Sequence, residues 1–347
     1  MASFMAYAPA KAILFGEHFV VYGAPGLVAA IRPENEIRVE SVEADGAPAG
    51  FEYESTIKKN DIVMDFLPSP SVSPTHPYAA LYLKLAAEFP SLCKLRIRSR
   101  VKKAWPLKGV GNSASLGAAL GAGLRSLGGE KHPAPSSIFE DAQTADEVAH
   151  GGRPSGIDAA AAAYGGVLEF EKDFSNPFKP KITPVKIASM RDVRFLLIDT
   201  LGPGEKHGST GELVARFAKN NGITKKPAEL DEKERERAYE PYHPLFVHAL
   251  LALREGDWAA LGLLMDQNHR LLQGSGVSSA GIEKAIAICK SFGALGAKLS
   301  GAGGPGGVVI ALVEKKRSAA MKEALGAGGF SSYAFEIAQK GVHAKRV

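Results

Sequence analysis

The sequence predicts a globular protein of about two domains that mixes β-strands with α-helices. Its 347 residues are enough for a substantial hydrophobic core. Short segments of alternating or continuous apolar residues, which are typical of strands, are interspersed with longer segments of helical pattern. Glycine is frequent, with 38 residues, and it gathers in clusters, which indicates contacts made by the backbone rather than a low-complexity tract.

Composition and charge exclude several kinds of partner. The chain has 42 basic and 37 acidic residues, and a net charge of +5 allows an anionic substrate but is too small to indicate nucleic-acid binding. No apolar run reaches the roughly 18 residues of a membrane-spanning helix, and the N-terminus lacks a signal-peptide pattern. Cys93 and Cys289 have no metal-binding spacing, which favours a reducing compartment. We therefore expect a cytoplasmic protein with a small-molecule partner.

The first predicted element is a strand at residues 5–15, and residues 18–31 continue as an apolar segment. Lys11, Glu17 and His18 interrupt this apolar background. A single charged residue there is usually a solvated strand end. Three polar residues beside glycines indicate a site instead.

The next elements follow from alternation, proline content and helical pattern. In order, we predict edge strands at 34–42 and 51–56, a loop at 66–76, a helix at 77–89 and a half-exposed strand at 93–101.

Residues 106–128, PLKGVGNSASLGAALGAGLRSLG, form the most informative stretch. A turn-forming run with Gly109 and Gly111 is followed by Ala, Leu and Gly without charge until Arg125. This pattern predicts a loop that enters a buried helix, with three candidates for its N-cap, Asn112, Ser113 and Ser115.

Such a junction is suited to bind an anion, because unpaired N–H groups and the helix dipole both favour negative charge there. Ser113 adds a hydroxyl for a phosphate or its metal ion. A tight turn before a core helix explains the stretch equally well when it is considered alone. No GKS or GKT follows the glycines, and the third glycine of a dinucleotide fingerprint is missing, so neither of those motifs applies.

A second candidate lies after the predicted helix at 138–150, where GGRPSG breaks the helix and Asp158 begins an alanine-rich run. An aspartate in this position is most often an N-cap. Here it lies between glycine-rich turns in a segment without other charges. A desolvated carboxylate is costly unless it has a function or a cationic partner.

The remaining elements are predicted from the same patterns. They are strands at 167–171 and 193–199, a crossing between domains at 173–192, a loop at 201–211, and helices at 211–219, 231–240, 243–254 and 256–273. Residues 293–312 predict a strand, a glycine turn and a β-branched strand. Five glycines in seven positions exceed what a hairpin needs and indicate close approach to a ligand.

The glycine-rich segments resemble the motifs of the GHMP kinase superfamily, and those of its mevalonate kinases most closely. APAKAILFGEHFVVYGAPGLVAAI resembles the first motif, KGVGNSASLGAAL the phosphate loop PxxxGLGSSAA, and GRPSGIDAAAAAYGG the segment HGxPSGxD. MDQNHRLLQGSGVSS and GAKLSGAGGPGGVVIAL resemble a helix and the third motif of the same enzymes. The resemblance covers nearly the whole chain.

The resemblance implies an α+β, two-domain GHMP kinase fold. Residues 1–185 would form a domain like ribosomal protein S5 domain 2, with the phosphate loop and the catalytic aspartate, and residues 186–347 a ferredoxin-like domain. The implied activity is ATP-dependent phosphorylation of the primary (C5) hydroxyl of mevalonate, which gives 5-phosphomevalonate and ADP in isoprenoid precursor synthesis. ATP and Mg²⁺ are the implied cofactors, and a homodimer is left open.

The resemblance also assigns roles to residues. Asp158 would accept the proton of the alcohol or orient it, and Lys11 would pair with Asp158 and the transferring phosphate. Ser113 and Glu147 would bind Mg²⁺. Backbone N–H groups would hold the phosphates of ATP, from Gly109, Val110, Gly111, Asn112, Ser113, Ala114 and Ser115. The acceptor side would include Glu17, His18, Thr210, Gly301 and Ala302, and residues 301–307 would close over the nucleotide.

The chain departs from the family pattern in several places. Asn112 replaces the first of two paired serines, Pro305 interrupts the last glycine cluster, and the loop at 201–210 is longer than expected. One extra residue follows His150. Counting back from Asp158 therefore favours Glu147 as the magnesium ligand, whereas counting back from His150 favours Asp146. We predict Glu147, because of its longer reach.

Other functions remain as alternatives. A phosphomevalonate kinase or a sugar kinase of the same superfamily is the nearest, and a phosphorylated substrate would need extra cations, for which Arg153 and Lys206 are candidates. Each is also expected as an ordinary surface charge. A non-catalytic relative would not need Lys11, Ser113 and Asp158. An oxidoreductase would need a strand–GxGxxG–helix unit near the N-terminus, which the sequence lacks.

Overall fold

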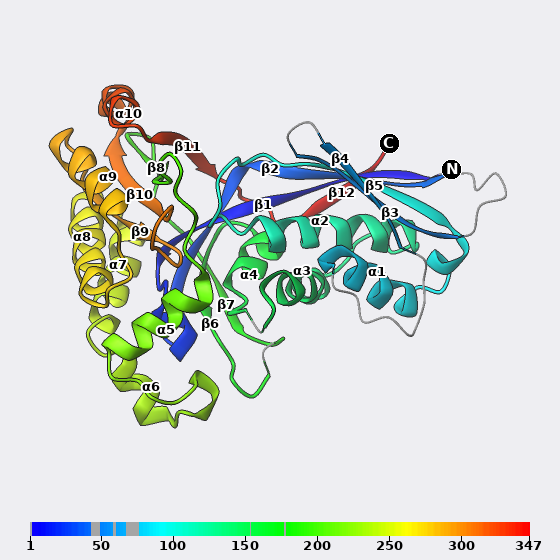
Figure 1. Ribbon diagram of the computed structural model, residues 1–347, viewed down its shortest axis with the longest axis horizontal. Helices are drawn as coiled ribbons and strands as arrows, with labels where there is room; N and C mark the ends of the chain where they lie inside the picture. The colour runs from blue at the N-terminus through cyan, green and yellow to red at the C-terminus, as the bar shows by residue number, and fades with distance from the viewer. Residues whose placement is uncertain (1, 43–48, 58–59, 67–75, 153, 177) are drawn as a thin grey trace.

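The computed structural model describes residues 2–42, 49–57, 60–66, 76–152, 154–176 and 178–347 (Figure 1). The first half of the chain forms, in order, β1 (Ser3–Phe15), η1 (Phe19–Tyr22), β2 (Gly26–Val42), β3 (Gly50–Ile57), β4 (Asn60–Phe66), α1 (Pro77–Glu88), η2 (Leu92–Lys94), β5 (Arg96–Lys102), α2 (Asn112–Leu127), α3 (Pro135–His150), α4 (Ile157–Tyr164), β6 (Val167–Glu171) and β7 (Lys181–Val185).

The second half continues with β8 (Val193–Asp199), α5 (Thr210–Asn220), η3 (Pro227–Glu229), α6 (Glu232–Tyr239), α7 (His243–Glu255), α8 (Trp258–Gly274), α9 (Ala280–Ser291), β9 (Gly296–Ser300), β10 (Val308–Glu314), η4 (Lys315–Arg317), α10 (Ser318–Ala327), β11 (Ser331–Ile337) and β12 (His343–Arg346). In the part of the chain that the structure describes, no helix is long and apolar enough to span a membrane.

The N-terminal half is a twisted sheet with α1, α2, α3 and α4 on one face (Figure 1). β2 is central, because it pairs with β1, β5, β6 and β11. The prediction of edge strands at 34–42 and 51–56 is therefore wrong, since β3 also lies between β4 and β5. Alternation in β2 reflects one face on the helices and one face without that cover, not a sheet edge.

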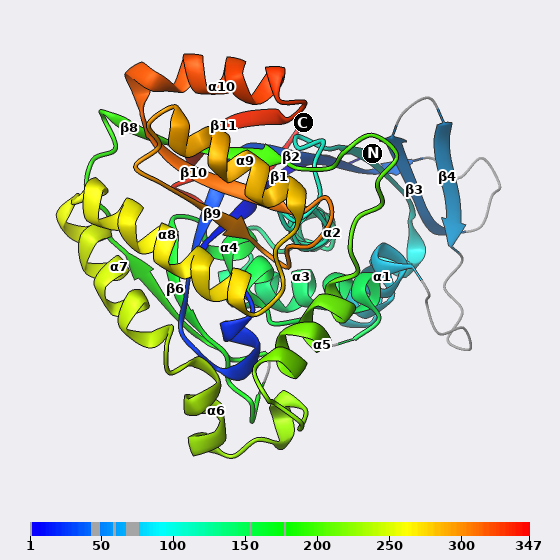
Figure 2. The same ribbon diagram turned by 60° about the vertical axis from the view of Figure 1, so that its left-hand side comes forward.

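The strands of the C-terminal half are antiparallel and follow the order β11-β8-β10-β9. With its intervening helices this is the βαββαβ order of a ferredoxin-like unit, as the resemblance implied. Helices α8, α9 and α10 lie along its outer side in both ribbon views (Figures 1 and 2). β11 also pairs with β2, which joins the two halves. β12 then returns to pair with β1, so the last residues lie in the N-terminal sheet rather than beside residues 186–337.

Most predicted helices and strands are present, with ends shifted by a few residues. β4 and the elements α9, α10, β11 and β12 were not predicted. The crossing at 173–192 contains the short strand β7. Of the predicted loop at 66–76, residues 67–75 lie outside the described residues.

The glycines of α2 allow this helix to pack closely against its neighbours. A Cβ atom at Gly117 would lie 2.7 Å from the Cβ of Ala145, and one at Gly123 would lie 2.5 Å from a methyl carbon of Val39. Real Cβ atoms do not approach so closely, so only glycine fits at these positions. This packing holds the N-terminus of α2 at a fixed place between β1 and α3.

Candidate active site

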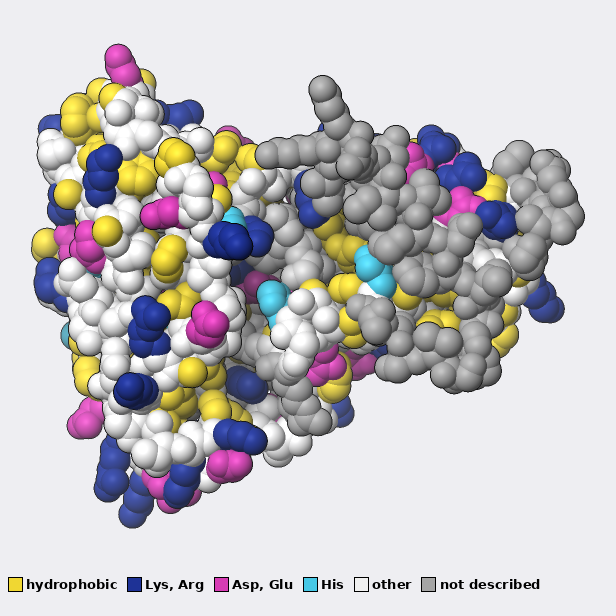
Figure 3. Space-filling view, viewed as in Figure 1, with side chains coloured by type: hydrophobic (Ala, Val, Ile, Leu, Met, Phe, Trp, Pro, Cys, Tyr) yellow, Lys and Arg dark blue, Asp and Glu magenta, His cyan; other side chains and the backbone are white. Residues whose placement is uncertain are grey.

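Lys11 and Asp158 meet between the two halves of the molecule, although they are far apart in the sequence. The Nζ atom of Lys11 lies 3.3 Å from Oδ1 of Asp158 and donates a hydrogen bond of 2.9 Å to the carbonyl oxygen of Gly109. Lys11 comes from β1, and Asp158 is the second residue of α4. The molecular surface is hollowed between the two halves, where acidic and histidine side chains lie close to each other (Figure 3).

The glycine loop is fixed beside this pair. The backbone N–H of Lys11 donates to the carbonyl oxygen of Val110 at 2.9 Å. Gly111 has a φ of +70°, and a Cβ atom there would lie 3.0 Å from Oδ2 of Asp158 and 2.9 Å from Cγ of Lys11. Glycine is needed at this position for both the left-handed backbone and the space. The first turn of α2 therefore begins directly beside the lysine and the aspartate.

The surroundings of Asp158 raise the pKa of its carboxyl group. Burial is the largest cause, the nearby Lys11 ammonium opposes it, and the Asp146 carboxylate adds to it. The position of Asp158 in the first turn of α4 favours its charged form, because the helix dipole is positive there. The side chain keeps 22% of its surface exposed, so a ligand can reach it.

The N-terminus of α2 has no side-chain cap. Its N-cap is Gly111, so the prediction of Asn112, Ser113 or Ser115 at this position is wrong. The first-turn N–H groups of Asn112, Ser113 and Ala114 are thus the donors that a helix leaves without an intrahelical partner. They are available to bind a phosphate.

Ser115 does not belong to this set of donors. Its N–H donates to the carbonyl oxygen of Gly111 at 3.0 Å, and its hydroxyl donates to the carbonyl oxygen of Ala8 at 3.0 Å. Both groups are used inside the fold, and the residue is fully buried. We therefore correct the prediction that Ser115 contacts a phosphate.

The carboxylate that faces Ser113 is that of Asp146, not that of Glu147. The hydroxyl of Ser113 donates to Oδ1 of Asp146 at 2.5 Å, and the same oxygen lies 3.3 Å from Nε2 of His150. Glu147 is about 100° further around α3 and makes no hydrogen bond with Ser113. The hydrogen bond to Asp146 raises the pKa of His150.

The inserted residue explains this outcome. α3 ends at His150, and Gly151 takes a left-handed conformation as its C-cap. The insertion therefore lies in the turn after the helix and leaves the register of the helix unchanged. The carboxylate that faces Ser113 is thus the one reached by counting back from His150, and the geometry favours Asp146 over the predicted Glu147.

His18 links the first motif to the last glycine turn. Its Nε2 atom lies 2.9 Å from the carbonyl oxygen of Ala302, and its ring stacks on Phe217. Burial lowers the pKa of His18 to about 4, so the ring is neutral near pH 7. Nε2 then carries the hydrogen that it donates to Ala302. Nδ1 is left as a buried acceptor without a hydrogen-bond partner among the described residues.

The last glycine turn also approaches the phosphate loop. A Cβ atom at Gly301 would lie 3.8 Å from the carbonyl oxygen of Gly109, so the two backbones are close. The structure thus brings Gly301 and Ala302 to the same cleft as Gly109 and His18. This convergence of distant glycine segments matches the sequence prediction.

Glu17 does not face this cleft. Its carboxylate forms an ion pair with Lys298 of β9 and accepts a hydrogen bond of 3.1 Å from Asn268 of α8. The side chains of Glu17 and Lys298 are fully buried. The prediction that Glu17 binds the acceptor is therefore corrected, because its carboxylate is used to join the two halves. Lys298 and Asn268 lie within quoted motifs, but no role had been assigned to them.

Thr210 is exposed at the first position of α5, and its side chain forms no hydrogen bond in the described part of the chain. The loop before it contacts the last glycine turn. Nδ1 of His207 lies 3.0 Å from the carbonyl oxygen of Gly306. The backbone N–H of Gly208 donates a hydrogen bond to the carbonyl oxygen of Pro305. The long loop and the inserted proline are thus one structural unit. Lys206 is exposed, and Arg153 lies outside the described residues.

Comparison with protein families agrees with this architecture. Residues 77–166 match the GHMP kinases N terminal domain, and residues 249–330 match the GHMP kinases C terminal domain. The first match contains the phosphate loop and Asp158, and the second contains Asn268, Lys298 and the last glycine turn. The fold and the site therefore define a GHMP kinase.

The chain belongs to the mevalonate kinase family. It is 32% identical to the mevalonate kinase of Thermococcus sibiricus, with 90% of each chain covered, and 30% identical to that of Aeropyrum pernix, with 97% and 96% covered. The crystal structure of L. major mevalonate kinase in complex with R-mevalonate is 26% identical, covers 96% of each chain and superimposes with a TM-score of 0.73. Membership of this kinase family implies the use of ATP.

The fold is shared more widely than the family. The galactokinase of Lactococcus lactis, solved in complex with galactose, has a TM-score of 0.76 at 21% identity. Similarity at this level shows the common fold alone. The acceptor of this protein must therefore be inferred from the site and from the close relatives.

Proposed function

We propose that this protein transfers the terminal phosphoryl group of ATP to the primary (C5) hydroxyl of mevalonate, giving 5-phosphomevalonate and ADP, a step of isoprenoid precursor synthesis. The observation that carries this proposal is the 3.3 Å pair of Lys11 and Asp158 beside the uncapped N-terminus of α2. The mevalonate kinases among its relatives support the choice of acceptor.

In phosphoryl transfer the protein contributes mainly position and charge stabilisation. The N–H groups of Asn112, Ser113 and Ala114, together with the dipole of α2, would hold the phosphates. Lys11 would stabilise the negative charge on the transferring group. Asp158 would orient the acceptor hydroxyl and take its proton, and a raised pKa makes it a better base than an ordinary carboxylate.

Ser113 and Asp146 fit a magnesium ion. They supply a hydroxyl and a carboxylate, whose oxygens lie 2.5 Å apart at the helix N-terminus where the phosphates would bind. Mg²⁺ prefers hard oxygen ligands, and it commonly uses one or two carboxylates together with substrate phosphates. When bound, the ion neutralises phosphate charge. This assignment replaces Glu147 with Asp146.

The acceptor would lie between Asp158 and His18. The free Nδ1 atom of His18 is suited to accept a hydrogen bond from a substrate hydroxyl, since the ring is held in place by Ala302 and Phe217. Gly301 and Ala302 would form the wall of the acceptor site. Thr210, exposed at the first position of α5, stays a candidate for the acceptor side.

A cytoplasmic location is also proposed. Cys93 and Cys289 are free thiols, which supports a reducing compartment. The formation of a homodimer stays a prediction.

The experiment is a substrate panel with coupled detection of ADP. Mevalonate, 5-phosphomevalonate and galactose are offered in turn with ATP and Mg²⁺, and the values of kcat/KM are compared. We expect mevalonate to be preferred by orders of magnitude. Preference for 5-phosphomevalonate or galactose would contradict the proposed acceptor, and absence of any ADP release would contradict the proposed catalysis.

A further inference from the structure

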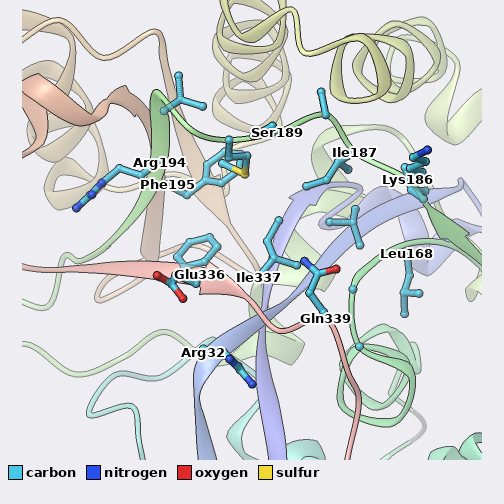
Figure 4. Close-up of a pocket in the computed structure, with 18 of the residues that line it drawn as sticks. Arg32, Leu168, Lys186, Ile187, Ser189, Arg194, Phe195, Glu336, Ile337 and Gln339 are labelled. Carbon is cyan, nitrogen blue, oxygen red and sulfur yellow. The ribbon is translucent and has the colours of Figure 1, made fainter.

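The charged side chains around the cavity between the two halves do not converge on one point. This cavity, of about 1180 Å³, is lined by residues of β2, β8 and β11 and by the linker at 184–190. Arg32, Lys186 and Arg194 point in different directions there (Figure 4). Arg32 also lies 4.0 Å from a carboxylate oxygen of Glu34. Polar atoms that do converge are found at the end of α3, inside the proposed active site.

His150 is a third polar side chain beside Ser113 and Asp146, and the proposed mechanism gives it no role. Its Nε2 atom lies 3.3 Å from Oδ1 of Asp146 and 3.4 Å from the hydroxyl oxygen of Ser113. The two oxygens lie 2.5 Å apart. Three donor atoms, one nitrogen and two oxygens, therefore form a small triangle at the N-terminus of α2.

The size of this triangle suits one small cation. Adjacent ligands of an ion with bonds of about 2.1 Å lie about 3.0 Å apart in octahedral geometry and about 3.4 Å apart in tetrahedral geometry. The two distances from Nε2, 3.3 Å and 3.4 Å, agree with this spacing. The shorter third side is a hydrogen bond between Ser113 and Asp146, which bound metal would replace.

Helix α3 explains why the imidazole and the carboxylate face the same point. Asp146 and His150 are four residues apart, so they lie one turn apart on one face of the helix. The same spacing brings the two histidines of an H-E-x-x-H motif to one metal ion. The side chain of His150 is 49% exposed, and a Cβ atom at Gly151 or Gly152 would have no neighbour within 4 Å. Space for phosphates and water therefore remains beside the ring.

The triangle differs from a closed metal site. In the described part of the chain, no group of three or more His, Cys, Asp or Glu side chains could hold a metal ion. The hydroxyl of Ser113, phosphate oxygens and water must complete the ligand set, which is usual for ions that act in phosphoryl transfer. The imidazole affects which ion is preferred. Mg²⁺ prefers hard oxygen ligands, whereas imidazole nitrogen is better suited to first-row transition ions.

We propose that Nε2 of His150 is a third protein ligand of this metal site and makes it selective for first-row transition ions over Mg²⁺. The inference rests on the proposed function, which brings the nucleotide phosphates to α2. It adds a nitrogen ligand to the two oxygen ligands already named. Mg²⁺ would use mainly the oxygens of Ser113 and Asp146, and an ion such as Mn²⁺ or Co²⁺ would also use the imidazole.

The first test identifies the ligand by pulsed electron paramagnetic resonance. Mn²⁺ is bound to the full-length protein with a non-hydrolysable ATP analogue, and the protein is labelled with ¹⁵N at its histidines. We expect a ¹⁵N coupling to Mn²⁺, which the unlabelled nucleotide cannot produce. Absence of this coupling in the parent protein would overturn the proposal.

Variants show which histidine is bound. His150→Gln should abolish the ¹⁵N coupling while Mn²⁺ still binds through Ser113 and Asp146. His132→Gln is the matched control and should keep the coupling. His132 is exposed just before α3, a helix about 24 Å long, and His150 is the last residue of that helix. A coupling that persists in His150→Gln would overturn the proposal.

The second test measures selectivity without reference to turnover. Isothermal titration calorimetry gives the Kd of Co²⁺ for the nucleotide-free protein, and displacement of Co²⁺ gives that of Mg²⁺. Mildly alkaline pH reduces competition by protons for the imidazole. His150→Gln should raise the Kd of Co²⁺ by about 10-fold or more and that of Mg²⁺ by less than about 3-fold. Equal changes for the two ions would overturn the proposal.

These outcomes are separate from the test of the proposed function. If the parent protein phosphorylates mevalonate with Mg²⁺ but shows no ¹⁵N coupling, the proposed function stands and His150 is not a ligand. If the coupling is present and mevalonate is not phosphorylated, the metal site stands and the proposed acceptor fails. If His150→Gln weakens binding of the ATP analogue equally with Co²⁺ and with Mg²⁺, the ring binds phosphate, and the proposal is overturned.

Discussion

Two lysine–carboxylate pairs in this protein have the same chemistry and opposite surroundings. Lys298 and Glu17 are fully buried, and Asn268 donates to the second carboxylate oxygen. Asp158, paired with Lys11 at 3.3 Å, keeps 22% of its side chain exposed beside an uncapped helix N-terminus. The first pair has no room for a ligand, and the second does. A buried ion pair therefore indicates a catalytic site only when one partner can still be reached.

The pair at Asp158 should control the reaction rate. Asp158→Asn should lower kcat by about 10²- to 10⁴-fold, the usual contribution of a positioned base, with little change in the folded structure. Steady-state kinetics with ADP detection, together with circular dichroism, measure both quantities. An unchanged kcat in this variant would remove Asp158 from the mechanism.

The pair at Glu17 should control stability instead. Glu17→Gln leaves Lys298 buried without a counter-charge and should lower the free energy of unfolding by about 3–5 kcal/mol. Because Glu17 does not face the cleft, kcat of the folded fraction should change far less than in Asp158→Asn. Urea unfolding measures the first effect. A stable Glu17→Gln protein that has lost kcat would reverse the two assignments.

Asp146 and Glu147 offer a matched pair for the magnesium site. Asp146→Ala should raise the Mg²⁺ concentration needed for half-maximal rate by about 10-fold or more, which corresponds to one lost contact of about 1.4 kcal/mol. Glu147→Ala should leave this concentration within about 2-fold of the parent, a change of less than 0.5 kcal/mol by the same relation. Titration of Mg²⁺ at fixed ATP measures both. An effect of Glu147→Ala alone would restore the original sequence prediction.

The smallest effect is on the pH dependence of stability. A carboxyl group whose pKa is higher in the folded protein holds its proton more tightly when folded. Its contribution to folding stability is therefore fully present below its pKa in the unfolded chain, and it is lost as pH rises through its pKa in the folded protein. For Asp158, the pH range over which this contribution is lost begins near the ordinary pKa of 3.8 and extends upward. The difference in Tm between ligand-free Asp158→Asn and the parent should thus grow in favour of the variant as pH rises through this window.

This comparison also sets the relative size of the two stability changes. Lys11 keeps its hydrogen bond to the carbonyl oxygen of Gly109 when Asp158 is changed to Asn, so this variant should lose less stability at neutral pH than Glu17→Gln. Differential scanning calorimetry of both variants at several pH values checks the contrast. A larger loss of Tm in Asp158→Asn would show that the surroundings of the two pairs do not differ as described.

Local signals in the sequence were sufficient to select the two residues that the structure brings together at the centre of the candidate site. Lone charges in apolar segments identified Lys11 and Asp158, and clustered glycines identified the loops that surround them. These signals are local, because glycine is selected by backbone conformation and by close approach. The order of the C-terminal sheet followed from the resemblance to a known family.

The other site residues could not be assigned from the sequence, because their roles depend on contacts between residues that are distant in the chain. The family resemblance assigned Glu17 to the acceptor side, and its ion-pair partner, Lys298, is 281 positions away and cannot be found from spacing. The choice between Asp146 and Glu147 required the end of α3, since an insertion in a turn cannot be placed by counting. Ser115 lay within the loop motif, but its hydroxyl is used by β1.

The most direct test is a crystal structure with a non-hydrolysable ATP analogue, Mg²⁺ and mevalonate. The triphosphate should lie on the N–H groups of Asn112, Ser113 and Ala114, and the C5 hydroxyl should lie within hydrogen-bond distance of Asp158. A nucleotide bound away from α2, or a C5 hydroxyl remote from Asp158, would contradict the account.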